Sequence, residues 1–304
     1  MRAQWWLGLS LMVSGCGGSD GFKEAVPTRS TLSVNVPGSS AGSSTGTTGE
    51  SQQALTGQRA TFYTATRNVT LMFNGGVGGF LDGIEHILAQ PPSAQSATHA
   101  VWGPSNDALA TANYKFEIEK VAAQSYVYQF SAKLKGAPDS AYQAMVHGAT
   151  QVVDAGHSTG DFHIDFDVAR QFDDNTMDQS AITVHFDTTG YPHQLDIVFS
   201  KADASGTTSN DAAYAYTENA DGGGTFQFVS PSDVNHDGTP ETLAITSRWL
   251  ASGQGRADVS ATGGSLGGKQ FGAVECWDTS FARSFYDENG DPATLEGDPK
   301  SCAF

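Results

Sequence analysis

The residues best suited to chemistry lie in one acidic stretch, residues 233–241. Oxygen-bearing residues occupy every second position there: Asp233, Asn235, Asp237, Thr239 and Glu241. Gly238 stands where the chain must turn tightly around an ion. Calcium takes about six to eight hard oxygen ligands, which carboxylates, an amide and the backbone carbonyl of Thr239 would supply. The spacing predicts one Ca²⁺ site, and a plain acidic turn remains the alternative.

This spacing resembles the calcium loops of EF-hand, dockerin and FG-GAP repeat proteins. An EF-hand would carry a bidentate Glu where Ala244 stands, and the alternation of Leu243 and Ile245 predicts a strand, whereas an EF-hand continues in a helix. The resemblance therefore favours a strand-loop-strand site that the carboxylate of Glu241 closes. Because the loop occurs once, we expect a structural ion that stabilises a hairpin.

The first cysteine belongs to an N-terminal targeting segment. Arg2 precedes a short apolar run that is too short to span a bilayer, and the run ends in Val13-Ser14-Gly15-Cys16. This segment resembles the lipobox of bacterial lipoproteins, whose Cys is lipidated and becomes the mature N-terminus. The resemblance implies a signal peptide over residues 1–15, lipidation of Cys16 and a membrane partner. Gly17 after the Cys favours the outer membrane of the cell envelope, and an ordinary secretory signal is the alternative.

The other two cysteines, Cys276 and Cys302, are expected to pair in a disulfide. Outside the cytoplasm the environment is oxidising, and two cysteines remain once Cys16 is assigned to the lipid. Ligation of a metal by two isolated cysteines is the weaker alternative.

A second group of metal-ligating residues alternates with apolar residues in two segments, namely His163, Asp165 and Asp167, then His185 and Asp187. Adjacent strands would bring these side chains together as zinc ligands. A solvated face of an acidic protein explains the same alternation. No nucleophile elbow or HExxH motif occurs, so the sequence does not indicate an enzyme.

The composition excludes one class of partner. The chain of 304 residues has 16 basic and 33 acidic residues, a formal net charge of −17. Nucleic-acid binding needs clustered Lys and Arg, so we expect no nucleic-acid partner. The negative surface would also repel anionic headgroups and hold the folded part away from the membrane.

Three segments with different patterns organise the chain. Residues 16–57 are rich in Gly, Ser and Thr and predict a flexible linker, although Thr31–Val36 alternates and would suit an edge strand. Residues 60–89 carry one apolar stripe at steps of three and four and predict a long helix that ends before Pro91. Its glycines favour either close approach of another backbone or a break into two helices.

From about residue 98 the apolar period becomes two. Runs such as Tyr114–Ile118, Phe162–Val168 and Leu195–Phe199 alternate with polar residues and are separated by turn residues. We therefore expect a mainly β (α+β) fold: a curved antiparallel meander or partial barrel of about ten strands around one long N-terminal helix. Residues 58–304 would form this single domain.

The helix-in-curved-sheet pattern is similar to that of bacterial lipoprotein carriers. Glu275-Cys276-Trp277-Asp278 and residues 247–258 are similar to segments of myxobacterial-type envelope lipoproteins that carry no assigned activity. The first hypothesis is a lipid-anchored, non-enzymatic structural or interaction protein of the envelope. The alternative is a periplasmic carrier of an apolar ligand between helix and sheet, which an apolar cavity above about 300 Å³ would favour. Large residues such as Phe73, Phe80 and Phe116 are expected to fill that space.

Overall fold

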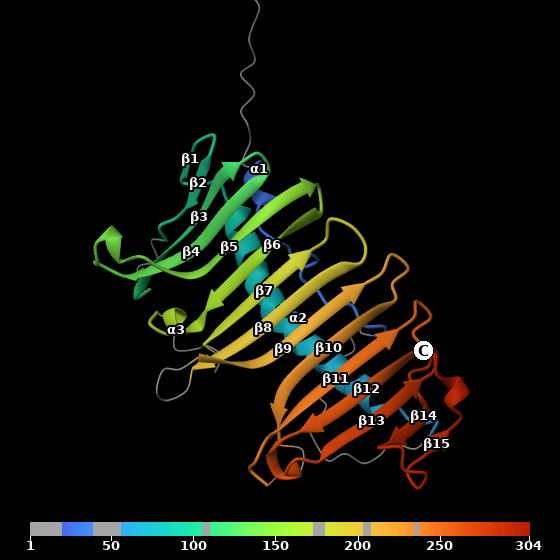
Figure 1. Ribbon diagram of the computed structural model, residues 1–304. Helices are drawn as coiled ribbons and strands as arrows, with labels where there is room; N and C mark the ends of the chain where they lie inside the picture. The colour runs from blue at the N-terminus through green and yellow to red at the C-terminus, as the bar shows by residue number, and fades with distance from the viewer. Residues whose placement is uncertain (1–19, 39–55, 106–109, 173–179, 203–207, 234–236) are drawn as a thin grey trace, which may run out of the picture.

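The fold is seen in a computed structural model that describes residues 20–38, 56–105, 110–172, 180–202, 208–233 and 237–304. Within these residues one open antiparallel sheet contains fifteen strands, each paired with the next along the chain (Figure 1). The strands are β1 (Ala94–Gln95), β2 (His99–Trp102), β3 (Ala112–Ala122), β4 (Ser125–Leu134), β5 (Gln143–Asp154), β6 (His157–Asp165), β7 (Ala181–Asp187), β8 (His193–Ala202), β9 (Thr208–Glu218), β10 (Gly224–Ser232), β11 (Glu241–Trp249), β12 (Gly255–Thr262), β13 (Gln270–Trp277), β14 (Arg283–Glu288) and β15 (Glu296–Gly297).

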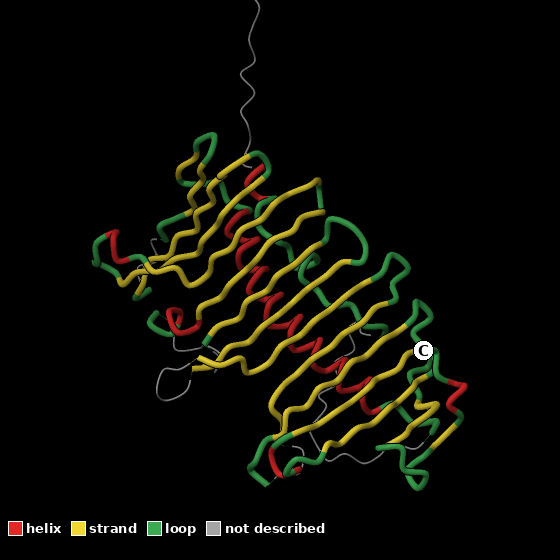
Figure 2. Tube along the Cα trace, viewed as in Figure 1, coloured by secondary structure: helices red, strands yellow, loops and turns green. Residues whose placement is uncertain are grey.

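The helices are few and unequal. The described helices are α1 (Asp20–Lys23), α2 (Thr61–Leu88) and α3 (Phe166–Ala169), with short 3-10 turns η1 (Asp139–Ala141), η2 (Gly264–Leu266) and η3 (Pro299–Ser301). Figure 2 shows α2 crossing one face of the sheet, transverse to the strands. No helix among the described residues is long and apolar enough to cross a membrane.

The mainly β class and the antiparallel meander are confirmed, but two details of the expected fold are wrong. The sheet has fifteen strands where about ten were expected, and three of the additional ones, β1, β2 and β15, have only two to four residues, too few to show alternation. The long helix is not N-terminal, since α1 and a packed segment precede it.

Helix α2 and the inner face of the sheet form the core. The residues Phe73, Val77, Leu81, Ile84 and Leu88 of α2 are at most 4% exposed and face strand residues such as Phe116 and Phe162, which are 0% exposed. The helix is continuous, so the two-helix alternative is wrong. A Cβ added at Gly75, Gly79 or Gly83 would meet nothing within 4 Å, so the expected close approach of another backbone is also absent at these positions.

Residues 21–38, which we call the N-terminal strap, lie within the expected linker of residues 16–57 but are packed. Leu32, Val34 and Val36 are at most 3% exposed, so the expectation of a flexible linker does not hold for the strap. The side chain of Asn74 on α2 accepts a hydrogen bond from Val34 N (2.9 Å) and donates one to Val34 O (2.8 Å). The strap therefore docks through alternate apolar residues, as an edge strand would, but against the helix and outside the sheet.

A buried carboxylate from the sheet caps the start of α2. Ala60, the N-cap residue, offers no side-chain hydrogen bond, and Glu275 of β13 instead accepts from Thr61 N (2.8 Å) and Phe62 N (2.5 Å). Arg283 of β14 donates from Nε to the same carboxylate (2.8 Å). Glu275 and Arg283 are 0% and 2% exposed. This ion pair ties the first turn of α2 to the C-terminal part of the sheet.

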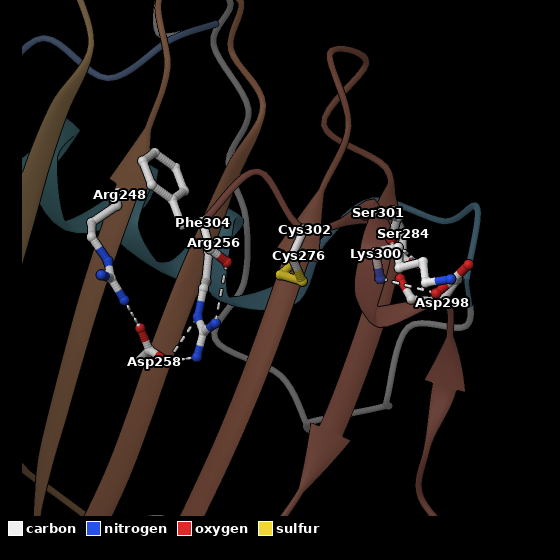
Figure 3. Close-up of a disulfide and its surroundings, with 10 residues drawn as sticks. All are labelled: Arg248, Arg256, Asp258, Cys276, Ser284, Asp298, Lys300, Ser301, Cys302 and Phe304. Atoms are coloured by element: carbon white, nitrogen blue, oxygen red, sulfur yellow. Dashed lines mark hydrogen bonds and ion pairs between the residues drawn. A yellow bond between two sulfur atoms is a disulfide. The ribbon is translucent and has the colours of Figure 1, made fainter.

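The expected disulfide between Cys276 and Cys302 is confirmed. Because side chains alternate along β13, Glu275 points toward α2 while Cys276 points to the outer face, where it holds the C-terminal segment (Figure 3). That segment places the ring of Phe304 over the Arg248 guanidinium, 5.8 Å from the ring centroid.

Replacing Cys302 with Ser is expected to lower the free energy of unfolding by about 3 kcal/mol, since the bond closes a loop with a sequence separation of 26. Urea denaturation of the oxidised protein and of the variant measures this difference. The Cys276→Ser/Cys302→Ser double variant is the control and should match the single variant. An unchanged denaturation midpoint would contradict a stabilising role for the bond.

Candidate ligand cavity

Helix α2 is narrower than the sheet that it crosses, so the sheet extends beyond the helix on both flanks. On one flank, Asn74, Gly78 and Asp82 face the N-terminal strap: a Cβ on Gly78 would lie 2.9 Å from the Arg29 guanidinium, which forms an ion pair with Asp82 (2.8 Å). These helix residues recur every four positions and so share one side of α2. The strap packs against the helix on this flank, and a cavity of about 500 Å³ remains between the strap and the sheet.

The other flank presents a different row of helix residues, Met72, Gly76 and Phe80. This row is offset from the first by two residues, about 200° of helix rotation, and therefore lies on the opposite side of α2. Helix α1 lies at the start of the N-terminal strap. In Figure 1, α1 and α3 lie at opposite ends of the strands. Among the described residues, the strap covers one flank and a cavity lies on the other.

The cavity has a volume of about 670 Å³ and an almost entirely apolar wall. Its lining comes from α2, from α3 and the residues after it, and from seven consecutive strands, β3 to β9: Met72, Phe73, Gly76, Val77, Phe80, Tyr114, Phe130, Met145, Val146, Ile164, Phe166, Ala169, Phe172, Ile182, Phe199, Ala212 and Tyr214. Met72 is 68% exposed and marks the mouth, whereas Met145 is 7% exposed and marks the interior. The volume is in the range of cavities that hold small molecules, about 300–1,000 Å³.

Aromatic rings form much of this wall and are packed against one another. The rings of Tyr114 and Phe130 stack with centroids 5.8 Å apart, and those of Phe199 and Tyr214 are 4.9 Å apart. Burial, and then the negative charge of Asp211, raise the pKa of the Tyr214 hydroxyl above its ordinary value. The lining residues that the structure describes therefore offer large apolar surfaces and two phenol groups, and none of them is charged.

The expectation that large residues fill the space between helix and sheet is wrong for this flank. Phe116, Phe186 and Trp249 are at most 3% exposed and do not line the cavity. Phe73, Phe80, Phe130 and Phe166 form its wall. The first three side chains are buried away from the cavity. The other four lie along its wall and leave its interior unfilled.

The predicted calcium residues that the structure describes are engaged in hydrogen bonds with nearby backbone and side-chain groups. The carboxylate of Asp233 accepts hydrogen bonds from the backbone of Asp237 (3.0 Å) and Gly238 (2.9 Å), and Asp237 accepts from Thr239 N (2.9 Å). Glu241 is 1% exposed and accepts from the Ser265 hydroxyl of η2 (2.7 Å). Asn235 lies outside the described residues. These bonds suit the plain turn, and the calcium site stays a prediction.

The expected His and Asp face is also occupied by local interactions. Asp165 caps α3 by accepting from Val168 N (2.9 Å), Asp167 forms an ion pair with Arg170, and Asp187 accepts from Thr189 N (2.9 Å). Among the described residues no group of three or more His, Cys, Asp or Glu side chains is arranged to hold a metal ion.

The outer face holds a histidine pair that the sequence does not reveal. His147 and His163 oppose each other on β5 and β6, with ring centroids 4.8 Å apart. Burial, and then the neighbouring His147, lower the pKa of His163 below the usual range. Only the strand register, which periodicity does not determine, brings these rings together.

Two residues of α2 mark the cavity mouth. Gly76 lines it, and a Cβ there would meet nothing within 4 Å, as at Gly75, Gly79 and Gly83, which do not line the cavity. An exposed methionine, Met72, lies one turn before Gly76.

Cys16, the predicted lipidation site, lies outside the described residues. Comparison with family models, with curated proteins and with solved structures finds no match to this chain.

Proposed function

We propose that this protein is a carrier that binds an apolar small molecule between α2 and the sheet. The cavity of about 670 Å³ beside Met72, Gly76 and Phe80 is the observation that carries the proposal. It is more than twice the volume of about 300 Å³ at which small-molecule cavities begin. A purely structural protein would gain stability by filling such a space, because apolar cavities cost free energy.

The proposal includes the anchored location that the lipobox-like segment predicts. Lipidation of Cys16 would hold the chain at the cell envelope, on the outer membrane, with a membrane as its partner. A net charge of −17 would keep the folded part away from anionic headgroups, and the cavity mouth would stay accessible to a ligand.

Binding of N-phenyl-1-naphthylamine, an uncharged probe that fluoresces in apolar surroundings, tests the proposal. We expect a saturable rise in emission with the full chain, because the cavity removes the probe from water. Bovine ribonuclease at the same concentration is the control for non-specific adsorption. Emission that rises linearly with probe, without saturation, would contradict the carrier function.

We also propose that Ca²⁺ binds the loop of residues 233–241 and stabilises the hairpin between β10 and β11. Free Ca²⁺ at a hundred times its Kd would add about 2.7 kcal/mol to the free energy of unfolding. We therefore expect a chelator to lower the melting temperature of the protein, and not that of the Asp233→Ala variant. Equal melting temperatures with and without chelator would contradict calcium binding by this loop.

A further inference from the structure

Resting on the proposed carrier function, we propose that the cavity selects uncharged ligands that carry one hydrogen-bond acceptor, such as an acyl ester, and that the Tyr214 hydroxyl donates to that acceptor. The proposal rests on three observations: the described lining residues carry no charge, Tyr214 lines the cavity, and the negative charge of Asp211 acts on its hydroxyl.

The lining excludes a charged ligand group from the interior. None of the described residues around the cavity is Asp, Glu, Lys, Arg or His. An ion that leaves water for such a surface loses its hydration and gains no partner. Arg170, the basic residue at the end of α3, is already paired with Asp167. A free carboxylate would therefore find no counter-charge along this wall.

Tyr214 is the lining residue placed to bind a polar atom. Its ring packs against Phe199, Phe226 and Phe73, with centroids 4.9, 5.6 and 6.5 Å away, which fixes the direction of the phenol. Its hydroxyl makes no hydrogen bond with another described residue, and burial keeps it protonated, so it is a donor. Because this donor is half-buried, a hydrogen-bond acceptor on the ligand would stabilise the complex by satisfying it.

The charge of Asp211 strengthens the selection. Asp211 lies three residues before Tyr214 on β9, and its negative charge adds to the effect of burial in raising the pKa of the tyrosine hydroxyl. A ligand carboxylate hydrogen-bonded to Tyr214 would be repelled by the same charge. A carbonyl or ester oxygen would accept the hydrogen bond without that repulsion.

Displacement of N-phenyl-1-naphthylamine at pH 8 by three matched competitors tests the inference. The competitors are methyl dodecanoate, dodecanoate and tridecane, which share an alkyl chain and differ in the polar end. We expect the ester to bind at least about tenfold more tightly than the carboxylate. Tyr214→Phe should weaken the ester about three- to tenfold and leave tridecane unchanged, as loss of one hydrogen bond predicts. Tyr191→Phe, at an exposed tyrosine outside the cavity, is the matched control.

The outcomes separate this inference from the proposed function. Equal affinity for ester and carboxylate, or equal weakening of ester and tridecane by Tyr214→Phe, would overturn the selection while leaving a carrier of apolar molecules. Failure of the probe and of all three competitors to bind would overturn both.

Discussion

Replacing Glu275 with Gln is expected to lower the free energy of unfolding by about 3–5 kcal/mol. The variant removes the buried carboxylate that accepts from Arg283 Nε, and Arg283 is 2% exposed. The Glu275 carboxylate accepts hydrogen bonds from the backbone N–H groups of Thr61 and Phe62. In the variant, the amide NH₂ of Gln cannot accept, so one of these two N–H groups loses its acceptor. Urea denaturation followed by circular dichroism measures the change.

Two controls separate the buried pair from general loss of charge. Glu296→Gln removes a second carboxylate near Arg283, 3.5 Å from Nη1, but its side chain is 23% exposed and its loss should cost less than about 1 kcal/mol. Glu275→Gln/Arg283→Met removes the uncompensated charge and should recover part of the stability. If Glu275→Gln and Glu296→Gln are equally stable, the buried pair is not what holds the start of α2.

Replacing Gly76 with Leu is expected to weaken binding of N-phenyl-1-naphthylamine at least about tenfold and to raise the stability by about 0.5–1 kcal/mol. Nothing lies within 4 Å of a Cβ at Gly76, which lines the cavity, so we expect the new side chain to extend into the cavity mouth. The gain in stability follows because leucine favours a helix interior and glycine does not. Probe titration and urea denaturation measure the two effects.

Gly75→Leu is the matched control, because Gly75 is also exposed and free of contacts but does not line the cavity. It should bring the same gain in helix stability and leave probe binding unchanged. Undiminished binding by Gly76→Leu, or equal loss in both variants, would show that the probe does not enter at this mouth.

Periodicity was sufficient to predict the main elements of this fold. The stripe over residues 60–89 corresponds to α2, Thr61–Leu88, because burial of one face requires apolar residues at helical spacing. Alternation likewise marks the long strands, such as β3 and β8. The pairing of Cys276 with Cys302 followed from counting, since they were the two cysteines left after Cys16.

Periodicity does not predict the features that depend on how strands, helix and strap pack side by side. The alternation over Thr31–Val36 indicates a docked segment, but where it docks depends on a groove that exists only once α2 lies on the sheet. The Glu275–Arg283 pair depends on which residues of β13 and β14 face the helix, and so on strand register. The cavity depends on how far the sheet extends beyond the helix, a width that no local pattern encodes.

The most direct test of the carrier account is a nuclear magnetic resonance titration of the full chain labelled at its methionine methyl groups. The chain has five methionines, and the two that the structure describes line the cavity: Met72 at the mouth and Met145 inside. We predict that N-phenyl-1-naphthylamine shifts the methyl signals of both residues and gives nuclear Overhauser contacts to Met145. Saturable binding that leaves the Met145 signal unshifted and without such contacts would contradict the account.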